Sequence, residues 1–197
     1  IFYDYEEGNC ETLKVCGESG GRLIPVATVD PRKFIGEFGE LEHLVDLGFK
    51  ALRLFPDIQN YPLEYAPILR VLRDMSGVGI PLILPYQGLG SLTKIAKLTK
   101  DGDYPVIVVG CSYNSLSEFI VLAGEHRHIY IETHLLDSPD AFEILVRRVG
   151  ADRLIFGSGI PLTYFKASYM MVEKAEISDE DKSLILGGNI LRLIGGL

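Results

Sequence analysis

Short segments that are almost continuously apolar recur along the chain, and longer amphipathic stretches separate them. The apolar segments cover residues 22–30, 50–55, 81–86, 105–110, 129–134 and 153–159. Polar residues seldom interrupt them, which is typical of strands that are covered on both faces. The pattern therefore predicts six buried parallel strands, each followed by a helical connection.

The stretches between these segments have helical periodicity. Residues 37–47 carry apolar side chains along one side of a helix, and Gly48 follows as a C-terminal cap. Serine and proline residues mark other helix starts, and an asparagine caps the closing helix. These expected starts are Pro62, Ser138 with Pro139, Ser178 and Asn189.

Strand–helix–strand repetition gives right-handed crossovers and a parallel α/β sheet. No low-complexity tract or linker divides the sequence, so we expect one domain over residues 1–197. Alternation alone leaves open a doubly wound sheet or a closed barrel. Neither GxGxxG after a first strand nor GxxxxGK[ST] is present, so the two common nucleotide-binding motifs are missing.

Composition narrows the range of partners. A formal net charge of −8 disfavours a nucleic-acid partner and an anionic membrane surface. The apolar segments are far shorter than the ~20 residues that cross a bilayer. Three cysteines, Cys10, Cys16 and Cys111, are an odd count without paired spacing, which favours reduced thiols and a cytoplasmic protein. We expect a small-molecule ligand.

Several phrases, in order, resemble the amidohydrolase-related family, in the branch that contains aminocarboxymuconate-semialdehyde decarboxylase. They are RLIPVATVDPR (22–32), LGFKALRLFPDIQNYPL (47–63), GIPLIL (79–84), HIYIETH (128–134), GADRLIFGSGIP (150–161) and ILGGNILRLIG (185–195). The resemblance implies a (β/α)8 TIM-barrel fold in which the six segments are the third to eighth strands. The first two strands, with the family's HxH metal motif, are then expected before Ile1. An incomplete barrel has exposed edges, so a partner or a homo-oligomer is possible.

The resemblance also implies a divalent metal such as zinc, held at the carboxyl ends of the strands. The positions expected to supply ligands read Pro85, Gly110 and Gly159, none of which has a metal-binding side chain. His126 and His128 have HxH spacing, but they precede a strand, at the end of a barrel that serves stability. We therefore expect no bound metal and a divergent relative.

Two groups remain as candidate functional residues. Glu132 and His134 share one face at the end of a strand and are expected to orient each other as an acid–base pair. Arg53 shares its face with Phe55 and is expected to bind a carboxylate or phosphate, because its planar fork matches such anions. The alternatives are a structural histidine at a strand end and, for Arg53, an internal salt bridge, for example with Glu132.

Further candidate substrate contacts follow the other strands. Tyr86 and Gln87 offer neutral hydrogen-bonding groups, unless Pro85 merely shapes their loop. Cys111 is either a nucleophile beside His134 or a buried inert thiol. Ser158 lies between Gly157 and Gly159, in a turn that either approaches a ligand or keeps small residues for packing.

Three functions fit these residues. The first is a hydrolase or decarboxylase that acts on a small carboxylate-bearing molecule. The second is a metal-free, catalytically silent barrel that binds or senses a small molecule. The third is a metal-independent enzyme that uses Glu132 with His134, or Cys111. A fold-level resemblance does not choose among them, since barrels host many unrelated reactions.

Overall fold

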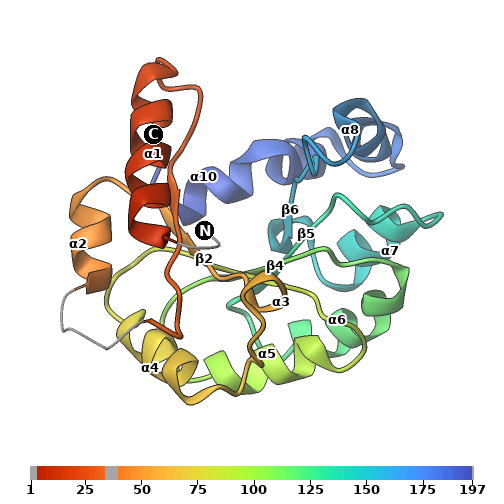
Figure 1. The fold of residues 1–197 in the computed structure, drawn as a ribbon. Helices are drawn as coiled ribbons and strands as arrows, with labels where there is room; N and C mark the ends of the chain where they lie inside the picture. The colour runs from red at the N-terminus through yellow and green to blue at the C-terminus, as the bar shows by residue number, and fades with distance from the viewer. Residues whose placement is uncertain (1–3, 34–39, 197) are drawn as a thin grey trace. The chain divides into compact units, whose positions relative to one another are not determined.

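The computed structural model describes residues 4–33 and 40–196. Each of the six predicted apolar segments contains a strand, although every strand is shorter than its segment. The strands are β1 (Val26–Ala27), β2 (Ala51–Arg53), β3 (Leu82–Pro85), β4 (Val106–Val109), β5 (Ile129–Glu132) and β6 (Leu154–Ile155). Helical segments lie between consecutive strands, so the predicted α/β alternation is confirmed (Figure 1).

The helices in the described part of the chain vary from one turn to four. They are α1 (Tyr5–Glu18), α2 (Glu40–Asp46), α3 (Pro56–Gln59), α4 (Ala66–Asp74), α5 (Ser91–Thr99), α6 (Leu116–Ala123), α7 (Ala141–Arg148), α8 (Phe165–Lys174), α9 (Asp179–Ser183) and α10 (Asn189–Leu193). A π-helical turn, Leu184–Gly188, joins α9 to α10. Short 3-10 turns, Tyr113–Ser115 and Ala151–Arg153, precede α6 and β6.

The chain divides into two compact units, residues 1–84 with 98–106 and residues 85–97 with 107–197. In the first unit β1 pairs parallel with β2, and β2 with β3. Ala27, Leu52 and Leu82 occupy equivalent positions in this register and are fully buried. The alternation of strand side chains therefore places Arg53, the next residue of β2, on the opposite face, where it is exposed.

Helix α1 is fastened to the end of β1 by one buried amide. The Asn9 side chain donates to the Thr28 carbonyl (2.8 Å) and accepts from the Thr28 backbone N–H (3.0 Å). The amide thus satisfies both backbone groups of a buried residue just beyond the strand, as a neighbouring strand would. Asp4 caps the first turn of α1 by accepting from the N–H groups of Glu6 and Glu7.

In the second unit β5 pairs parallel with β6, with Glu132 opposite Ile155. Helices α6 and α7 lie side by side (Figure 1). The carboxylate of Glu118, from α6, accepts hydrogen bonds from the backbone N–H groups of Gly90 and Thr93 at the start of α5. This acidic group satisfies amides that a helix start leaves without partners.

Two buried polar side chains hold the ends of β5 and β6. Asn189 is fully buried and donates to the carbonyls of Ala151 and Leu154. Arg153 is 5% exposed, and its guanidinium donates to the carbonyls of Ala123, His126 and Ile129. These contacts serve backbone groups rather than a ligand, so we assign both side chains a structural role.

Some predicted helix boundaries were wrong. The helix expected from Pro62 begins at Ala66, because residues 62–65 form a separate turn. The helix expected from Pro139 begins at Ala141, after Asp140 in a left-handed conformation (φ 58°). Asn189 lies at the start of α10, with its side chain directed to neighbouring carbonyls rather than capping the helix. Ser178 is confirmed as an N-cap that accepts from the Asp181 N–H.

The predicted helix 37–47 is observed from Glu40, and residues 37–39 lie outside the described ranges. The expectation of one domain over residues 1–197 stays a prediction.

Replacing Arg153 by methionine tests the role of its buried guanidinium. The change leaves three backbone carbonyls without their donor, so we expect the free energy of unfolding to fall by about 3 kcal/mol or more. Urea denaturation followed by circular dichroism measures this loss. Arg148→Met, at an exposed position of α7, is the matched control and should change stability little. Equal effects of the two substitutions would contradict the structural role of Arg153.

Candidate functional site

The Glu132 carboxylate lies at the carboxyl end of β5 and accepts hydrogen bonds from several donors. Oε1 accepts from the His134 backbone N–H at 2.8 Å. Oε2 contacts Nδ1 of the His134 ring and also accepts from the Gly110 N–H at 3.5 Å. The side chain is 10% exposed, so an unpaired carboxylate here would be costly. These donors fix both oxygens, and the predicted pairing of Glu132 with His134 is present.

The His134 imidazole is held at Nδ1 and is only partly buried. Its side chain is 20% exposed, and Nδ1 faces the Glu132 carboxylate. A carboxylate accepts but does not donate, so we assign the proton to Nδ1 and leave Nε2 as the acceptor in the neutral ring. When the ring is protonated, Nε2–H becomes a donor and Glu132 stabilises the positive charge. This arrangement is that of a general acid or base with its orienting partner.

The turn after β6 makes room for this pair. A Cβ on Gly157 would overlap the Glu132 carboxyl group and would lie 2.6 Å even from its Cγ. The Gly157 N–H donates to the Thr133 hydroxyl at 3.3 Å, which holds the turn against the end of β5. Of the two sequence alternatives for the 157–159 turn, close packing therefore explains Gly157: it lets β6 approach the Glu132 side chain.

The structure speaks against Cys111 as a nucleophile. Its side chain is fully buried, and burial raises the pKa of the thiol to about 12. Its sulfur atom lies 3.7 Å from the Val108 carbonyl oxygen. A thiol with so high a pKa stays protonated at neutral pH and is inert. Of the two sequence alternatives for Cys111, these observations favour the buried inert thiol, and its role as a substrate contact stays a prediction.

The other predicted contacts of the second unit lie in two loops. The Tyr86 hydroxyl oxygen is buried without a hydrogen-bond partner among the described residues, and burial raises its pKa. Gln87 is exposed, and its backbone N–H donates to the Ser91 hydroxyl. The Ser158 hydroxyl accepts from the Ile160 N–H at 3.4 Å. The substrate-binding role of these three residues stays a prediction.

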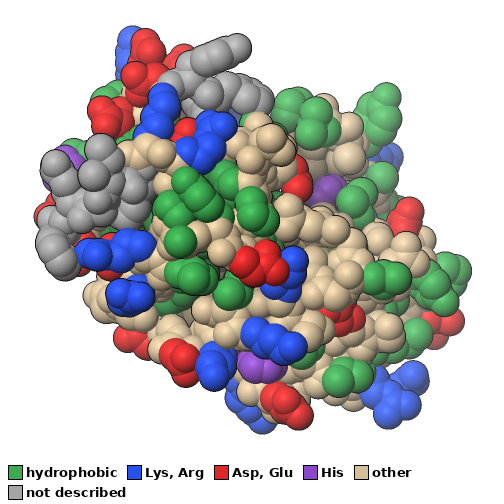
Figure 2. Space-filling model, turned by 60° about the horizontal axis from the view of Figure 1, so that its bottom comes forward, with side chains coloured by type: hydrophobic (Ala, Val, Ile, Leu, Met, Phe, Trp, Pro, Cys, Tyr) green, Lys and Arg blue, Asp and Glu red, His purple; other side chains and the backbone are tan. Residues whose placement is uncertain are grey.

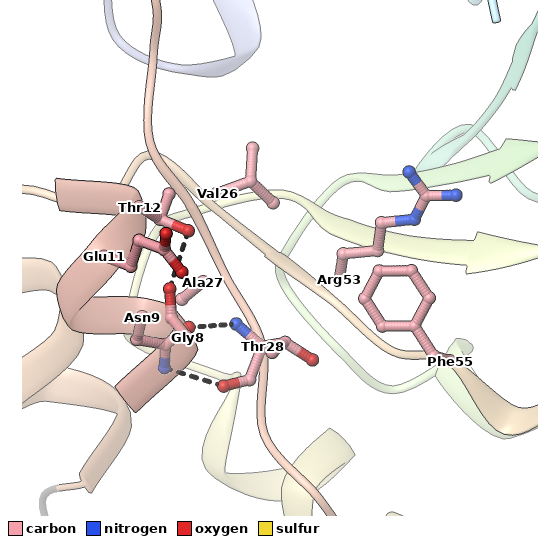
Figure 3. A pocket seen from close by; sticks show the side chains of 9 residues that line it. All are labelled: Gly8, Asn9, Glu11, Thr12, Val26, Ala27, Thr28, Arg53 and Phe55. Carbon is pink, nitrogen blue, oxygen red and sulfur yellow. Dashed lines mark hydrogen bonds between the residues drawn. The ribbon is translucent and has the colours of Figure 1, made fainter. Parts of the chain in front are cut away.

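Arg53 lies in a separate pocket of the first unit (Figure 3). The pocket has a volume of about 480 Å³, and α1, β1 and the end of β2 form its walls. The Arg53 guanidinium lies 4.8 Å from the centre of the Phe55 ring, so the predicted shared face of these two residues is confirmed. The opposite wall carries the Asn9 amide, bonded to Thr28, as the dashed lines show. The lining residues are Gly8, Asn9, Glu11, Thr12, Val26, Ala27, Thr28, Arg53 and Phe55.

Sequence reasoning missed two threonines beside the acid–base pair. The Thr133 hydroxyl accepts from Gly157, and the Thr163 hydroxyl donates to the Ser158 carbonyl. Neither belongs to a motif, and Thr163 lies in a connection whose conformation no periodicity predicts. The fold brings them to the pair, Thr133 through its hydrogen bond with Gly157 and Thr163 through the turn after β6.

Within residues 4–33 and 40–196, no group of three or more His, Cys, Asp or Glu side chains is placed to hold a metal ion. His126 and His128 contact each other edge to face before β5, and burial lowers the pKa of His128. Together with Pro85, Gly110 and Gly159, this means that the described residues do not fit the metal that the resemblance implies.

Charged and apolar side chains are mixed on the surface. On the face drawn in Figure 2, basic and acidic groups alternate with exposed hydrophobic ones. In the second unit several exposed apolar residues follow strands, among them Leu89, Tyr113 and Leu162. No helix in the described part of the chain is long and apolar enough to span a membrane.

The chain belongs to the amidohydrolase family, because that family's sequence model matches residues 6–196. This result confirms the resemblance found in the sequence, and the matched residues include both candidate sites. No curated protein sequence matches the chain.

Solved structures share the fold at low sequence identity. An uncharacterised TIM-barrel protein from Bordetella bronchiseptica superposes with a TM-score of 0.80 and 19% identity, over 95% of this chain and 72% of that one. The 2,6-dihydroxybenzoate decarboxylase from Rhizobium superposes with a TM-score of 0.74 and 16% identity, over 97% of this chain and 76% of the decarboxylase. The 5-carboxyvanillate decarboxylase from Novosphingobium aromaticivorans, complexed with manganese, superposes with a TM-score of 0.74 and 13% identity, over 97% of this chain and 69% of the decarboxylase. The fold is therefore of the TIM-barrel type.

Thiol labelling tests the assignment of Cys111. We expect iodoacetamide at about pH 8 to modify the exposed Cys10 in the native protein and to leave Cys111 unmodified, because the buried thiol is not ionised. Peptide mass spectrometry measures the labelling of each cysteine. Labelling in denaturant is the control and should modify both. Modification of Cys111 in the folded protein as fast as Cys10 would contradict a buried, protonated thiol.

Proposed function

We propose that this protein is a hydrolase or decarboxylase that acts on a small carboxylate-bearing molecule. The observation that carries the proposal is the Glu132–His134 pair, in which the carboxylate orients the imidazole at the end of a parallel strand. In parallel α/β folds, and in TIM barrels in particular, functional side chains lie at such carboxyl ends. Membership of the amidohydrolase family and the likeness to two decarboxylases support the same class of reaction.

The pair can move a proton in either direction. In decarboxylation the bond between the substrate carbon and its carboxylate breaks, and the electron pair stays on that carbon. Protonated His134 then donates its Nε2 proton to the carbon, and carbon dioxide leaves. In hydrolysis neutral His134 accepts a proton from water at Nε2 while the water oxygen attacks the acyl carbon. The bond between the acyl carbon and the leaving group then breaks, and the leaving group takes the proton from Nε2. Glu132 holds Nδ1–H throughout.

Substitution of the pair tests the proposal. The full-length protein should be assayed on a panel of hydroxybenzoates for carbon dioxide release and on simple amides and esters for hydrolysis. On any substrate that turns over, His134→Gln should lower kcat by about 100-fold or more, because the proton donor is lost. Glu132→Gln should lower kcat too, because the imidazole loses its orienting carboxylate. His43→Gln, on the exposed surface of α2, is the matched control.

Full activity of His134→Gln would contradict the acid–base role. A panel without any turnover, combined with measurable binding of a carboxylate ligand, would instead favour the catalytically silent binding protein.

A carboxylate-binding role for Arg53 is tested separately. If the guanidinium binds a carboxylate in its own pocket, Arg53→Met should raise the Kd for benzoate by about 10-fold or more, and Arg53→Lys should recover only part of the loss, because an ammonium lacks the planar fork. Isothermal titration calorimetry measures both variants. The exposed Arg148→Met is the control for loss of one positive charge. An unchanged Kd for Arg53→Met would contradict a carboxylate-binding role for Arg53.

A further inference from the structure

The side-chain space at position 159 is occupied by His134 and Thr163. A Cβ on Gly159 would lie 2.9 Å from Cδ2 of His134, and it would overlap the Thr163 hydroxyl. Carbon atoms that are not bonded prefer a separation of about 3.5–4.0 Å. The backbone at Gly159 also has φ of +65°, a conformation that side chains other than glycine adopt at a cost. No carboxylate side chain fits at this position without moving His134 and Thr163.

A closed turn fixes Thr163 in that space. The Gly159 carbonyl accepts from the N–H groups of Leu162 (2.9 Å) and Thr163 (3.1 Å). The Thr163 hydroxyl donates to the Ser158 carbonyl, which ties the two ends of the turn together. The Thr163 side chain and Cδ2 of His134 therefore both border the Gly159 side-chain position.

Gly110 and Gly157 accommodate the Glu132 side chain. The Gly110 N–H, where the family resemblance expects a metal-binding histidine, donates to Glu132 Oε2. Gly157 has no side chain, and the Glu132 carboxyl group fills the space. Three glycines, one after β4 and two after β6, thus contribute a backbone N–H or empty volume to one pair of side chains.

We infer that His134 and Thr163 occupy the space at position 159 where the family resemblance places a metal ligand, so that the Glu132–His134 pair transfers protons without a metal held by these residues, and that Thr163 is a positioning residue for the His134 ring. This inference rests on the proposed acid–base role of the pair. The occupied site proposed here differs from a degraded metal site, because a degraded site would have a cavity at the position of the lost ligand.

Manganese supplies the direct test, because its unpaired electrons broaden the NMR signals of nearby nuclei. The protein of residues 1–197 is stripped with a chelator and titrated with Mn²⁺ alone, and the ring signals of His134 are followed. We expect these signals to stay as sharp as those of the exposed His43. Broadening of the His134 signals at one equivalent of Mn²⁺ would overturn the inference. The experiment needs no substrate, so its outcome is independent of whether the proposed activity is found.

Glycine substitutions test the occupied space. Gly159→Ala should shift the His134 ring signals and, where a substrate is known, lower kcat by about 10-fold or more, because the added methyl group displaces the ring. Gly48→Ala is the matched control, since Gly48 also has positive φ but has no atom within 4 Å of its Cβ position. It shares the backbone strain without the overlap, and should leave His134 unchanged. Unchanged His134 signals in Gly159→Ala would contradict the occupied space.

The Thr163 hydroxyl is tested by a pair of variants. Thr163→Val keeps the shape but loses the hydrogen bond to Ser158, whereas Thr163→Ser keeps the bond. We expect Thr163→Val to shift the His134 ring signals and Thr163→Ser to restore them. Identical His134 spectra in both variants would remove Thr163 from the positioning role.

Discussion

The candidate functional site depends on the hydrogen bonds that the Glu132 carboxylate accepts. A carboxylate that is 10% exposed must have donors for both of its oxygens, and here the backbone N–H of His134, the ring of His134 and the backbone of Gly110 supply them. Gly157 admits the carboxyl group against the turn after β6. The contacts of this one carboxylate explain four features of the second unit. These are the turn after β4, the end of β5, the glycine turn after β6 and the orientation of the imidazole.

Much of the fold could be predicted because buried parallel strands have a simple pattern. Continuous apolar runs such as 105–110 and 129–134 identified strands, and all six predicted segments contain one. The failures came at helix starts after Pro62 and Pro139, where a proline fits a turn as well as a first helical position. Strand parity placed Glu132 with His134 and Arg53 with Phe55, and both pairs are in contact.

The sequence predicted the relative positions of site residues only where the alternation of side chains along a strand determines them. Cys111 was expected as a possible contact because its position after β4 is typical of functional residues, but the burial that raises its thiol pKa depends on packing that the sequence does not encode locally. Gly159 was seen as a lost ligand. Its occupation by His134 and Thr163 is a property of three segments brought together, and no spacing in the sequence expresses it.

The central claim is that Glu132 holds the His134 ring with its proton on Nδ1, and nitrogen-15 NMR of the imidazole tests it most directly. The account predicts a neutral ring protonated on Nδ1, with a strongly downfield Nδ1 proton that is lost in Glu132→Gln and kept in the exposed Glu125→Gln. A ring protonated on Nε2, or one that averages between both forms as in a free histidine, would contradict the account.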